Sequence, residues 1–384
     1  MNLKMQQGVW QSGSARSLWW RRRGGLLCLL AVLLMHWPVR TAAAPSVTAG
    51  TPIPVLAYYY IWFDAGSWNR AKTDYPALGR YSSDDAAVMR QHVRWAKQAG
   101  IDGFIVSWKS TPILNRRLEQ LIDIAEAEDF KLSIIYQGLD FERRPLPPDR
   151  IAADLGHFID RYANRAPFDL FDRPLVIWSG TWEFSRDDLA KVTAQHRGPL
   201  LILASERNAA DYERVGDLFD GNAYYWSSVN PETFPAYQDK LTAMASAVHD
   251  RAGFWIAPAA PGFDARLIGG TRVVERREGA TLRQQMNAAW QSSPDAVGLI
   301  SWNEFSENSH VEPSVVHGAR YLEVLADIQG ASAPIIADFD SSEPADTQSW
   351  LDGSRVMALG GLLISVFVTL VVIARRQLAK QQYG

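Results

Sequence analysis

A regular alternation of short apolar runs with longer mixed segments, from residue 51 to residue 329, most constrains the fold of this chain. The apolar runs show no polar–apolar alternation, which is typical of parallel strands buried on both faces. The predicted strands are 54–60, 101–107, 131–136, 174–178, 200–205, 221–226, 254–258 and 296–301. The predicted helices are 83–99, 113–129, 148–164, 185–196, 209–216, 231–250, 281–291 and 314–328.

This alternation predicts an α/β fold, a single (β/α)8 TIM barrel over residues 51–329, because such a barrel needs eight successive β–α units. The alternative is an open, doubly wound sheet. That fold more often carries a glycine-rich phosphate loop after its first strand, and the sequence has none at this place.

The N-terminal residues 1–44 are predicted to be a signal peptide. Lys4, Arg16 and Arg21–Arg23 precede the apolar run 26–34, and small residues follow at 42–44. That order is typical of export signals. The only cysteine, Cys28, lies inside this segment, so the rest of the chain contains neither a disulfide nor a thiol nucleophile.

The C-terminal residues are predicted to anchor the chain in a membrane. Residues 331–353 contain several Asp and Ser residues and no basic residue, which favours a flexible acidic linker. The uncharged run 356–374 is long enough for a transmembrane helix, and the basic tail 375–384 that follows is typical of the cytoplasmic side. We therefore expect a single-pass protein of the cell membrane, with its barrel periplasmic or extracellular. The alternative for 356–374 is a buried core helix.

The segment Ser301–Pro313 carries the chemistry-bearing residues. Glu304, Glu307 and Glu312 follow the last predicted strand, together with Trp302, Asn303, Phe305 and His310. Apolar surroundings raise the pKa of a carboxyl group, and two carboxyls in different surroundings can divide the roles of acid and base. The alternative is a loop of solvated glutamates. Glu307, His310 and Glu312 could also hold a metal ion, but we expect neither a metal nor another cofactor.

Aromatic residues recur at the carboxyl ends of the predicted strands, which is where barrels of this type hold their active sites. The chain has 15 Trp, 13 Tyr and 15 Phe, and flat rings stack on the faces of sugars. The predicted substrate-binding residues are Tyr59, Tyr60, Trp62, Trp108, Tyr136, Tyr225, Trp226, Asp264, Trp302, Asn303, His310 and Glu312. A net charge of −3 indicates neither a nucleic-acid partner nor an acidic polymer. We therefore expect a neutral oligosaccharide or polysaccharide as substrate.

These residues resemble those of glycoside hydrolase family 99, the endo-α-mannosidase and endo-α-mannanase family. The matching pieces are Tyr59-Tyr60-x-Trp62-Phe63, Gly79-x-Tyr81-Ser82-Ser83-Asp84, Ala99-Gly100-Ile101-Asp102-Gly103-Phe104, Ser107-Trp108, Pro261-Gly262-Phe263-Asp264 and Asn303-Glu304-x-x-Glu307 with Glu312. The family usually has Trp and His between the two glutamates and Gly after them, where this chain has Phe305, Ser306 and Asn308.

The resemblance implies a catalytic pair. Glu304 would deprotonate the 2-hydroxyl of an α-mannoside, and Glu307 would protonate the departing oxygen. A 1,2-anhydro sugar would form, and water would open it with retention of configuration. These roles lead us to expect a low pKa for Glu304 and a raised one for Glu307.

Two other functions fit the sequence. One is conventional hydrolysis by two carboxylates, in which Glu206 or Glu183 would act with Glu304. The other is a carbohydrate-binding barrel without catalytic activity, tethered to the membrane.

Overall fold

The computed structural model describes residues 52–70, 72–234 and 236–334, and this part of the chain forms a closed parallel barrel. Its strands are β1 (Val55–Tyr60), β2 (Gly103–Trp108), β3 (Lys131–Gln137), β4 (Leu175–Ser179), β5 (Leu201–Ala204), β6 (Gly221–Ala223), β7 (Phe254–Ala259) and β10 (Ala296–Leu299). The strand order β1-β10-β7-β6-β5-β4-β3-β2 closes on itself, with Val55 beside Val297 and Tyr58 beside Ile105. The predicted TIM barrel is confirmed.

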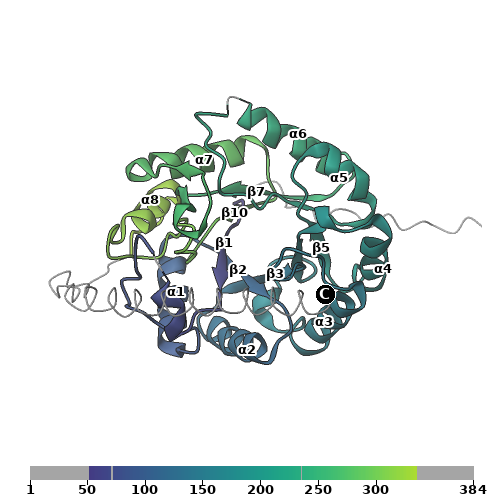
Figure 1. Ribbon diagram of the computed structural model, residues 1–384, viewed down its shortest axis with the longest axis horizontal. Coiled ribbons are helices and arrows are strands. Elements are labelled where there is room, and N and C mark those ends of the chain that lie inside the picture. Colours follow the sequence, from purple (N-terminus) through teal and green to yellow (C-terminus); the bar gives the residue numbers. More distant parts are fainter. Residues whose placement is uncertain (1–51, 71, 235, 335–384) are drawn as a thin grey trace, which may run out of the picture. The chain divides into compact units, whose positions relative to one another are not determined.

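A ring of helices surrounds the barrel (Figure 1). They are α1 (Ala86–Gln98), α2 (Pro112–Ala127), α3 (Pro148–Arg161), α4 (Arg186–His196), α5 (Ala209–Val215), α6 (Tyr237–His249), α7 (Ala280–Gln291) and α8 (Arg320–Gln329). Short 3-10 turns are η1 (Ala65–Asn69), η2 (Ala166–Phe168), η3 (Thr181–Glu183), η4 (Gly216–Leu218), η5 (Arg266–Ile268) and η6 (Arg277–Gly279). The order of strands and helices follows the predicted one, and most of their bounds agree within a few residues.

Three helices begin at least three residues later than predicted, among them α6, which begins at Tyr237 instead of residue 231. Helix α1 begins at Ala86 because the Asp85 side chain caps it, accepting hydrogen bonds from the amides of Ala87 and Val88. Helix α8 begins at Arg320, since Ser314 and Gly318 first close a turn by exchanging backbone hydrogen bonds.

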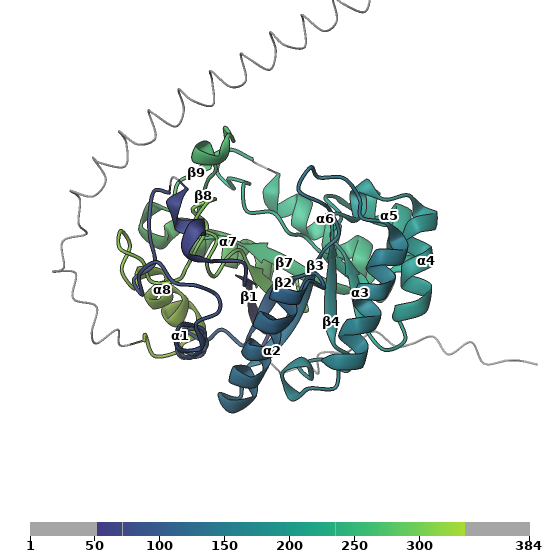
Figure 2. The ribbon, with the colours of Figure 1, turned by 60° about the horizontal axis from the view of Figure 1, so that its bottom comes forward.

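A small antiparallel hairpin, β8 (Phe263–Asp264) and β9 (Val273–Val274), interrupts the connection between β7 and α7 and was not predicted. Figure 2 shows it beyond the end of the strands. Strands this short give no periodic sequence signal, so the segment could only be predicted as a loop.

Every barrel strand except β6 contributes residues to two hydrophobic clusters, because successive side chains of a strand point to opposite faces. One cluster fills the barrel interior and includes Leu56, Tyr58, Ile105 and Ile256. The other lies between the strands and the helices. Gly298 belongs to the inner layer, and a Cβ atom there would lie 2.9 Å from the ring of Tyr58, so a larger residue would displace that ring.

Most predictions for the chain ends lie outside the described residues. They are the signal peptide 1–44, most of the acidic linker 331–353, the transmembrane helix 356–374 and the cytoplasmic tail 375–384. Within the described residues, no helix is both long enough and apolar enough to span a bilayer.

Candidate active site

The loop after β10 holds Glu304 in a fixed position. Its amide donates a hydrogen bond of 2.8 Å to the Ser301 hydroxyl, and its carboxylate accepts one of 2.9 Å from the Ser306 amide. The Ser309 amide closes the loop onto the Glu304 carbonyl at 3.2 Å. Glu304 is 7% exposed and Glu307 is partly buried. The loop thus fixes one carboxyl group and leaves the other more accessible.

The charge of Glu304 acts on Glu307, and both glutamates act on two tyrosines beside them. Burial, and then the charge of Glu304, raises the pKa of Glu307 to about 7. The carboxylates also help to raise the pKa values of Tyr60 and Tyr225, after burial, which places both phenols near the pair. The hydroxyls of Tyr60 and Tyr225 are hydrogen-bonded to each other. Strand β1 and the loops after β6 and β10 therefore converge on one polar cluster.

Two cations flank the glutamates, and sequence reasoning missed both. Lys72 donates a hydrogen bond of 3.3 Å to the Ser306 hydroxyl, and its charge opposes the rise in the pKa of Glu304. Arg143, from the loop after β3, opposes the rise in the pKa of Glu307. No spacing in the sequence relates these loops to the Glu304 loop, because only closure of the barrel brings them together.

The expectation of a low pKa for Glu304 is wrong. Burial raises its pKa, and the hydrogen bonds from Ser306 and the charge of Lys72 only partly offset this. A raised pKa makes a carboxylate a stronger base once it has lost its proton. Glu304 therefore loses its proton at a higher pH than we expected, and its expected role as the base is compatible with this.

Five predicted substrate contacts lie around or beside the glutamates. Trp62 is 41% exposed and stacks on Tyr60, with ring centroids 4.4 Å apart. Asp264 donates its amide to the Glu307 carbonyl at 2.7 Å, while Arg266 holds its carboxylate. The other two are Tyr225, which is hydrogen-bonded to Tyr60, and Trp226, which lines a neighbouring cavity.

Four predicted substrate contacts are corrected, because their side chains lie in the helical layer. They are Tyr59, Trp108, Tyr136 and Trp302, all at most 1% exposed and all in the cluster outside the barrel. Tyr59 shows the reason: Tyr58 and Tyr60 point inward, so the residue between them points outward to His92 of α1, 3.0 Å from its hydroxyl. Tyr136 likewise donates to Asp154 of α3 at 3.0 Å.

Asn303, His310 and Glu312 are also corrected, since they are at most 1% exposed and hold the loop in place. The Asn303 amide accepts from the Tyr60 amide at 2.8 Å and donates to the Tyr60 carbonyl at 3.0 Å, which joins the loop to β1. Glu312 accepts a hydrogen bond of 2.8 Å from the Tyr81 hydroxyl and lies 3.0 Å from the His92 ring. The ring of His310 lies 3.2 Å from the Asp74 carboxylate.

The one metal-capable group among the described residues consists of Asp74, His310 and His317, with ligand atoms within 4.8 Å of one another. Arg276 is buried beside it, with a guanidinium nitrogen 3.3 Å from the His310 ring. Burial and the charge of Arg276 lower the pKa of His310 to about 3. A fixed cation at this distance disfavours a second one, and the predicted alternative set of Glu307, His310 and Glu312 does not form such a group.

The alternative partners of Glu304 lie elsewhere. Glu206 is buried, with its carboxylate 3.6 Å from Arg214 of α5. Burial raises its pKa to about 7, and the charges that act on it come from Arg214, Asp211 and Arg207 of its own β–α unit. Glu183 is exposed in η3. The carboxylate that acts on Glu307 is Glu304.

The arrangement suits acid–base chemistry on a sugar, and comparison with known proteins identifies the family. The sequence profile described as glycosyl hydrolase family 99 matches residues 64–329. The chain belongs to glycosyl hydrolase family 99. The resemblance noted from the motifs is confirmed, and membership identifies the chain as a glycoside hydrolase.

Curated relatives of this family-99 chain include two mouse proteins. One, described as "Glycoprotein endo-alpha-1,2-mannosidase-like protein", is 23% identical over 323 residues, which are 77% of this chain and 67% of the relative. The other, described as "Glycoprotein endo-alpha-1,2-mannosidase", is 21% identical over 266 residues, which are 63% of this chain and 56% of the relative. The chain thus spans roughly three fifths of these relatives' lengths.

Solved structures agree on the fold. The family-99 endo-alpha-mannosidase from Bacteroides thetaiotaomicron, in complex with bis-tris-propane, superposes with a TM-score of 0.62 at 19% identity. The superposition covers 71% of this chain and 95% of that one. Another structure of the endo-alpha-mannosidase from this organism gives a TM-score of 0.63 at 17% identity and covers 73% and 98% of the two chains.

Proposed function

We propose that this family-99 chain hydrolyses α-mannosidic bonds within a glycan or polysaccharide and retains the configuration at the cleaved carbon. The observation that carries the proposal is the pair of Glu304 and Glu307, in which burial and Glu304 raise the pKa of Glu307 to about 7. A carboxyl group with that pKa is protonated often enough near neutral pH to act as a general acid. The names of the mouse relatives support α-mannosides as the substrate class.

The first half of the reaction uses the geometry of mannose. Its 2-oxygen is axial and anti to an axial leaving oxygen, so it can attack the anomeric carbon from behind. Glu304 takes the proton of the 2-hydroxyl as the bond from that oxygen to the anomeric carbon forms. The glycosidic bond breaks at the same time, and Glu307 gives its proton to the departing oxygen.

The second half reverses these roles. Glu307, now ionised, removes a proton from water as the water attacks the anomeric carbon of the 1,2-anhydro sugar. The bond from the anomeric carbon to the 2-oxygen breaks, and Glu304 returns its proton to that oxygen. Two inversions give net retention, and both carboxyl groups end in their starting states.

The test uses the full-length chain with α-mannan and with an aryl α-mannoside, followed by proton NMR of the first product. We expect turnover of an α-mannosidic substrate, with the α-anomer appearing first. A β-anomer as first product would overturn the retaining mechanism. Absence of turnover on every α-mannoside, with turnover of another glycoside, would overturn the substrate class.

We further propose that the chain is anchored in the cell membrane by residues 356–374, with the barrel on the extracytoplasmic side. The support is the uncharged run and the basic residues after it. Protease added to spheroplasts that express the full chain should digest the barrel. Complete protection, with digestion only after lysis, would contradict this topology.

A further inference from the structure

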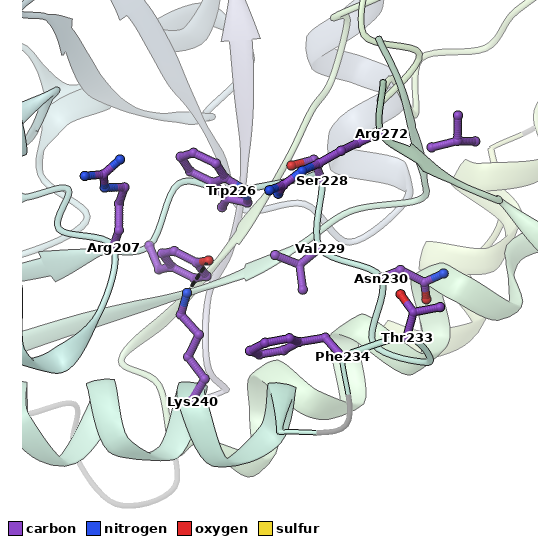
Figure 3. Close-up of a pocket in the computed structure, with 11 residues that line it drawn as sticks. Arg207, Trp226, Ser228, Val229, Asn230, Thr233, Phe234, Lys240 and Arg272 are labelled. Atoms are coloured by element: carbon purple, nitrogen blue, oxygen red, sulfur yellow. Dashed lines mark hydrogen bonds between the residues drawn. The ribbon is translucent and has the colours of Figure 1, made fainter. Parts of the chain in front are cut away.

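A cavity of about 530 Å³ lies beside the candidate active site, between the loops after β5 and β6, the β8–β9 hairpin and α6. Three of its lining residues are cations that come from three different elements: Arg207, Lys240 and Arg272 (Figure 3). None of the residues that line it is an acid. The balanced charge of the whole chain therefore conceals a local excess of positive charge.

The cavity wall contributes no acidic residue to neutralise the three cations, and the acids that act on Lys240 and Arg207 are Asp211 and Glu206, which do not line it. Lys240 donates a hydrogen bond of 2.8 Å to the neutral hydroxyl of Tyr224. Arg207 lies over the ring of Trp182, 5.1 Å from its centroid. Arg272 is exposed and forms no hydrogen bond or ion pair within the described part of the chain. Like charges that share a cavity repel one another, and an anion between them relieves that repulsion.

Aromatic and hydrogen-bonding groups complete the cavity wall. Trp226 and Phe234 both line it, and Phe234 is 41% exposed. Ser228 and Asn230 add groups that can bond sugar hydroxyls. Exposed rings beside such groups are typical of sugar subsites, in which a ring stacks on the face of a sugar and polar atoms fix its orientation.

Two short stretches of chain connect the cavity to the catalytic pair. Trp226 directly follows Tyr225, whose hydroxyl is bonded to Tyr60 beside the glutamates. Arg272 directly precedes β9, which pairs with β8, and Asp264 of β8 donates its amide to the Glu307 carbonyl at 2.7 Å. The loop after β6 and the β8–β9 hairpin thus each contribute residues both to the cavity and to the surroundings of the glutamates.

We propose that this cavity is a subsite for a sugar residue that carries an anionic group, a carboxylate or a phosphate or sulfate ester, so that the glycan processed by the chain is acidic. This replaces the neutral substrate expected from the sequence. The inference rests on the proposed function, because it takes the glycan bound here to be the one cut at Glu304 and Glu307.

The test measures binding, so that it does not depend on turnover. Full-length chain carrying Glu307→Gln is titrated by calorimetry in a non-ionic detergent at low salt. Three probes of equal length are used: a neutral α-manno-oligosaccharide, the same oligosaccharide with a terminal phosphate, and a mannuronate oligosaccharide. Arg272→Gln and the double variant Arg272→Gln/Lys240→Gln are compared with Arg283→Gln, which removes an exposed α7 cation paired with Asp327.

We expect at least one anionic probe to bind about tenfold more tightly than the neutral probe, with an advantage that shrinks as salt is added. Arg272→Gln should remove most of this advantage, and Arg283→Gln should retain it. Preference for mannuronate would identify the group as a carboxylate, and preference for the phosphate probe would identify an ester.

Equal binding of all three probes, or an anionic preference that survives in the double variant, would overturn the inference. The thermal unfolding midpoint of each variant is measured as well. An unchanged midpoint shows that a loss of binding comes from the subsite and not from unfolding. Failure of the proposed function would appear separately, as absence of α-mannoside turnover by the unmodified chain. The binding comparison could still be interpreted in that case, because it does not depend on turnover.

Discussion

The loop after β10 carries two kinds of glutamate, and comparing them shows how the surroundings of Glu312 differ from those of the proposed catalytic pair. Glu312 is fully enclosed, with one oxygen held by His92 and the other by the Tyr81 hydroxyl. Glu304 and Glu307 lie a few residues earlier, with no ion pair to either carboxylate in the described structure and with raised pKa values. The three glutamates share one loop, so the difference between them lies in the groups that contact each carboxylate. The contacts of Glu312 hold the loop in place, whereas Glu304 and Glu307 remain able to exchange protons.

The largest expected effect comes from Glu304→Gln. It should lower kcat/KM by about a hundredfold to ten thousandfold on every α-mannoside, because activation of the 2-hydroxyl is needed whatever the leaving group. The unfolding midpoint should change little, since the loop is tied by backbone contacts. Steady-state kinetics and thermal unfolding check this, with Glu183→Gln as the control. Full activity of the Glu304→Gln variant, or loss of activity in the Glu183→Gln variant, would contradict the assignment of Glu304 as the base.

Glu307→Gln should show an effect that depends on the leaving group. On substrates with poor leaving groups the loss should again be about a hundredfold or more, because the departing oxygen needs a proton. On activated aryl mannosides, whose leaving oxygen needs little protonation, the loss should be only a few-fold. Rates across a series of aryl mannosides of falling leaving-group pKa measure this. An equal loss across the series would remove Glu307 from the role of acid.

Glu312→Gln should show the opposite pattern. The amide cannot accept from both His92 and Tyr81, so the free energy of unfolding should fall by about 1–3 kcal/mol. Below the unfolding midpoint, kcat/KM should fall by only a few-fold, because the side chain holds the loop and does not face the cleft. Denaturant unfolding and kinetics on the same preparation test this. A catalytic loss as large as that of Glu304→Gln, at unchanged stability, would place Glu312 with the catalytic pair.

The smallest expected effect is a shift in pH dependence from Lys72→Met. Lys72 opposes the rise in the pKa of Glu304, so its removal should raise that pKa further. The base must be ionised, so the acidic limb of the kcat/KM profile should move to higher pH, by about one unit or less. The alkaline limb, set by loss of the Glu307 proton near pH 7, should stay in place. Lys191→Met in α4 is the matched control. A shift to lower pH would contradict the assignment of Glu304 as base.

The barrel, and the proximity of Glu304 and Glu307, could be predicted from sequence because each depends on residues that are close along the chain. Eight apolar runs define the strands, and Glu304 and Glu307 share one loop. The orientation of the aromatics could not be predicted. Tyr58, Tyr59 and Tyr60 are identical side chains in an apolar run, so nothing in the run shows which of them faces the barrel interior.

Residues contributed by separate loops could not be predicted either. Lys72 and Arg143 reach the glutamates from the loops after β1 and β3. Arg272 lines the cavity that also contains Arg207 and Lys240, and it comes from a hairpin that has no sequence signal. Their positions depend on how the barrel closes and how each loop folds over its end. Net charge gave no indication of them, because the 42 acidic residues of the chain slightly outnumber its 39 lysines and arginines.

The central claim, that Glu304 acts through the substrate's own 2-hydroxyl, is tested most directly with two matched substrates. The unmodified chain is given an activated aryl α-mannoside and its 2-O-methyl analogue, and release of the aryl group is followed under identical conditions. The account predicts that the first substrate is hydrolysed and the second is inert, because a methylated oxygen has no proton for Glu304 to remove. Hydrolysis of the 2-O-methyl substrate at a comparable rate would contradict the account and assign the first step to direct attack by a carboxylate.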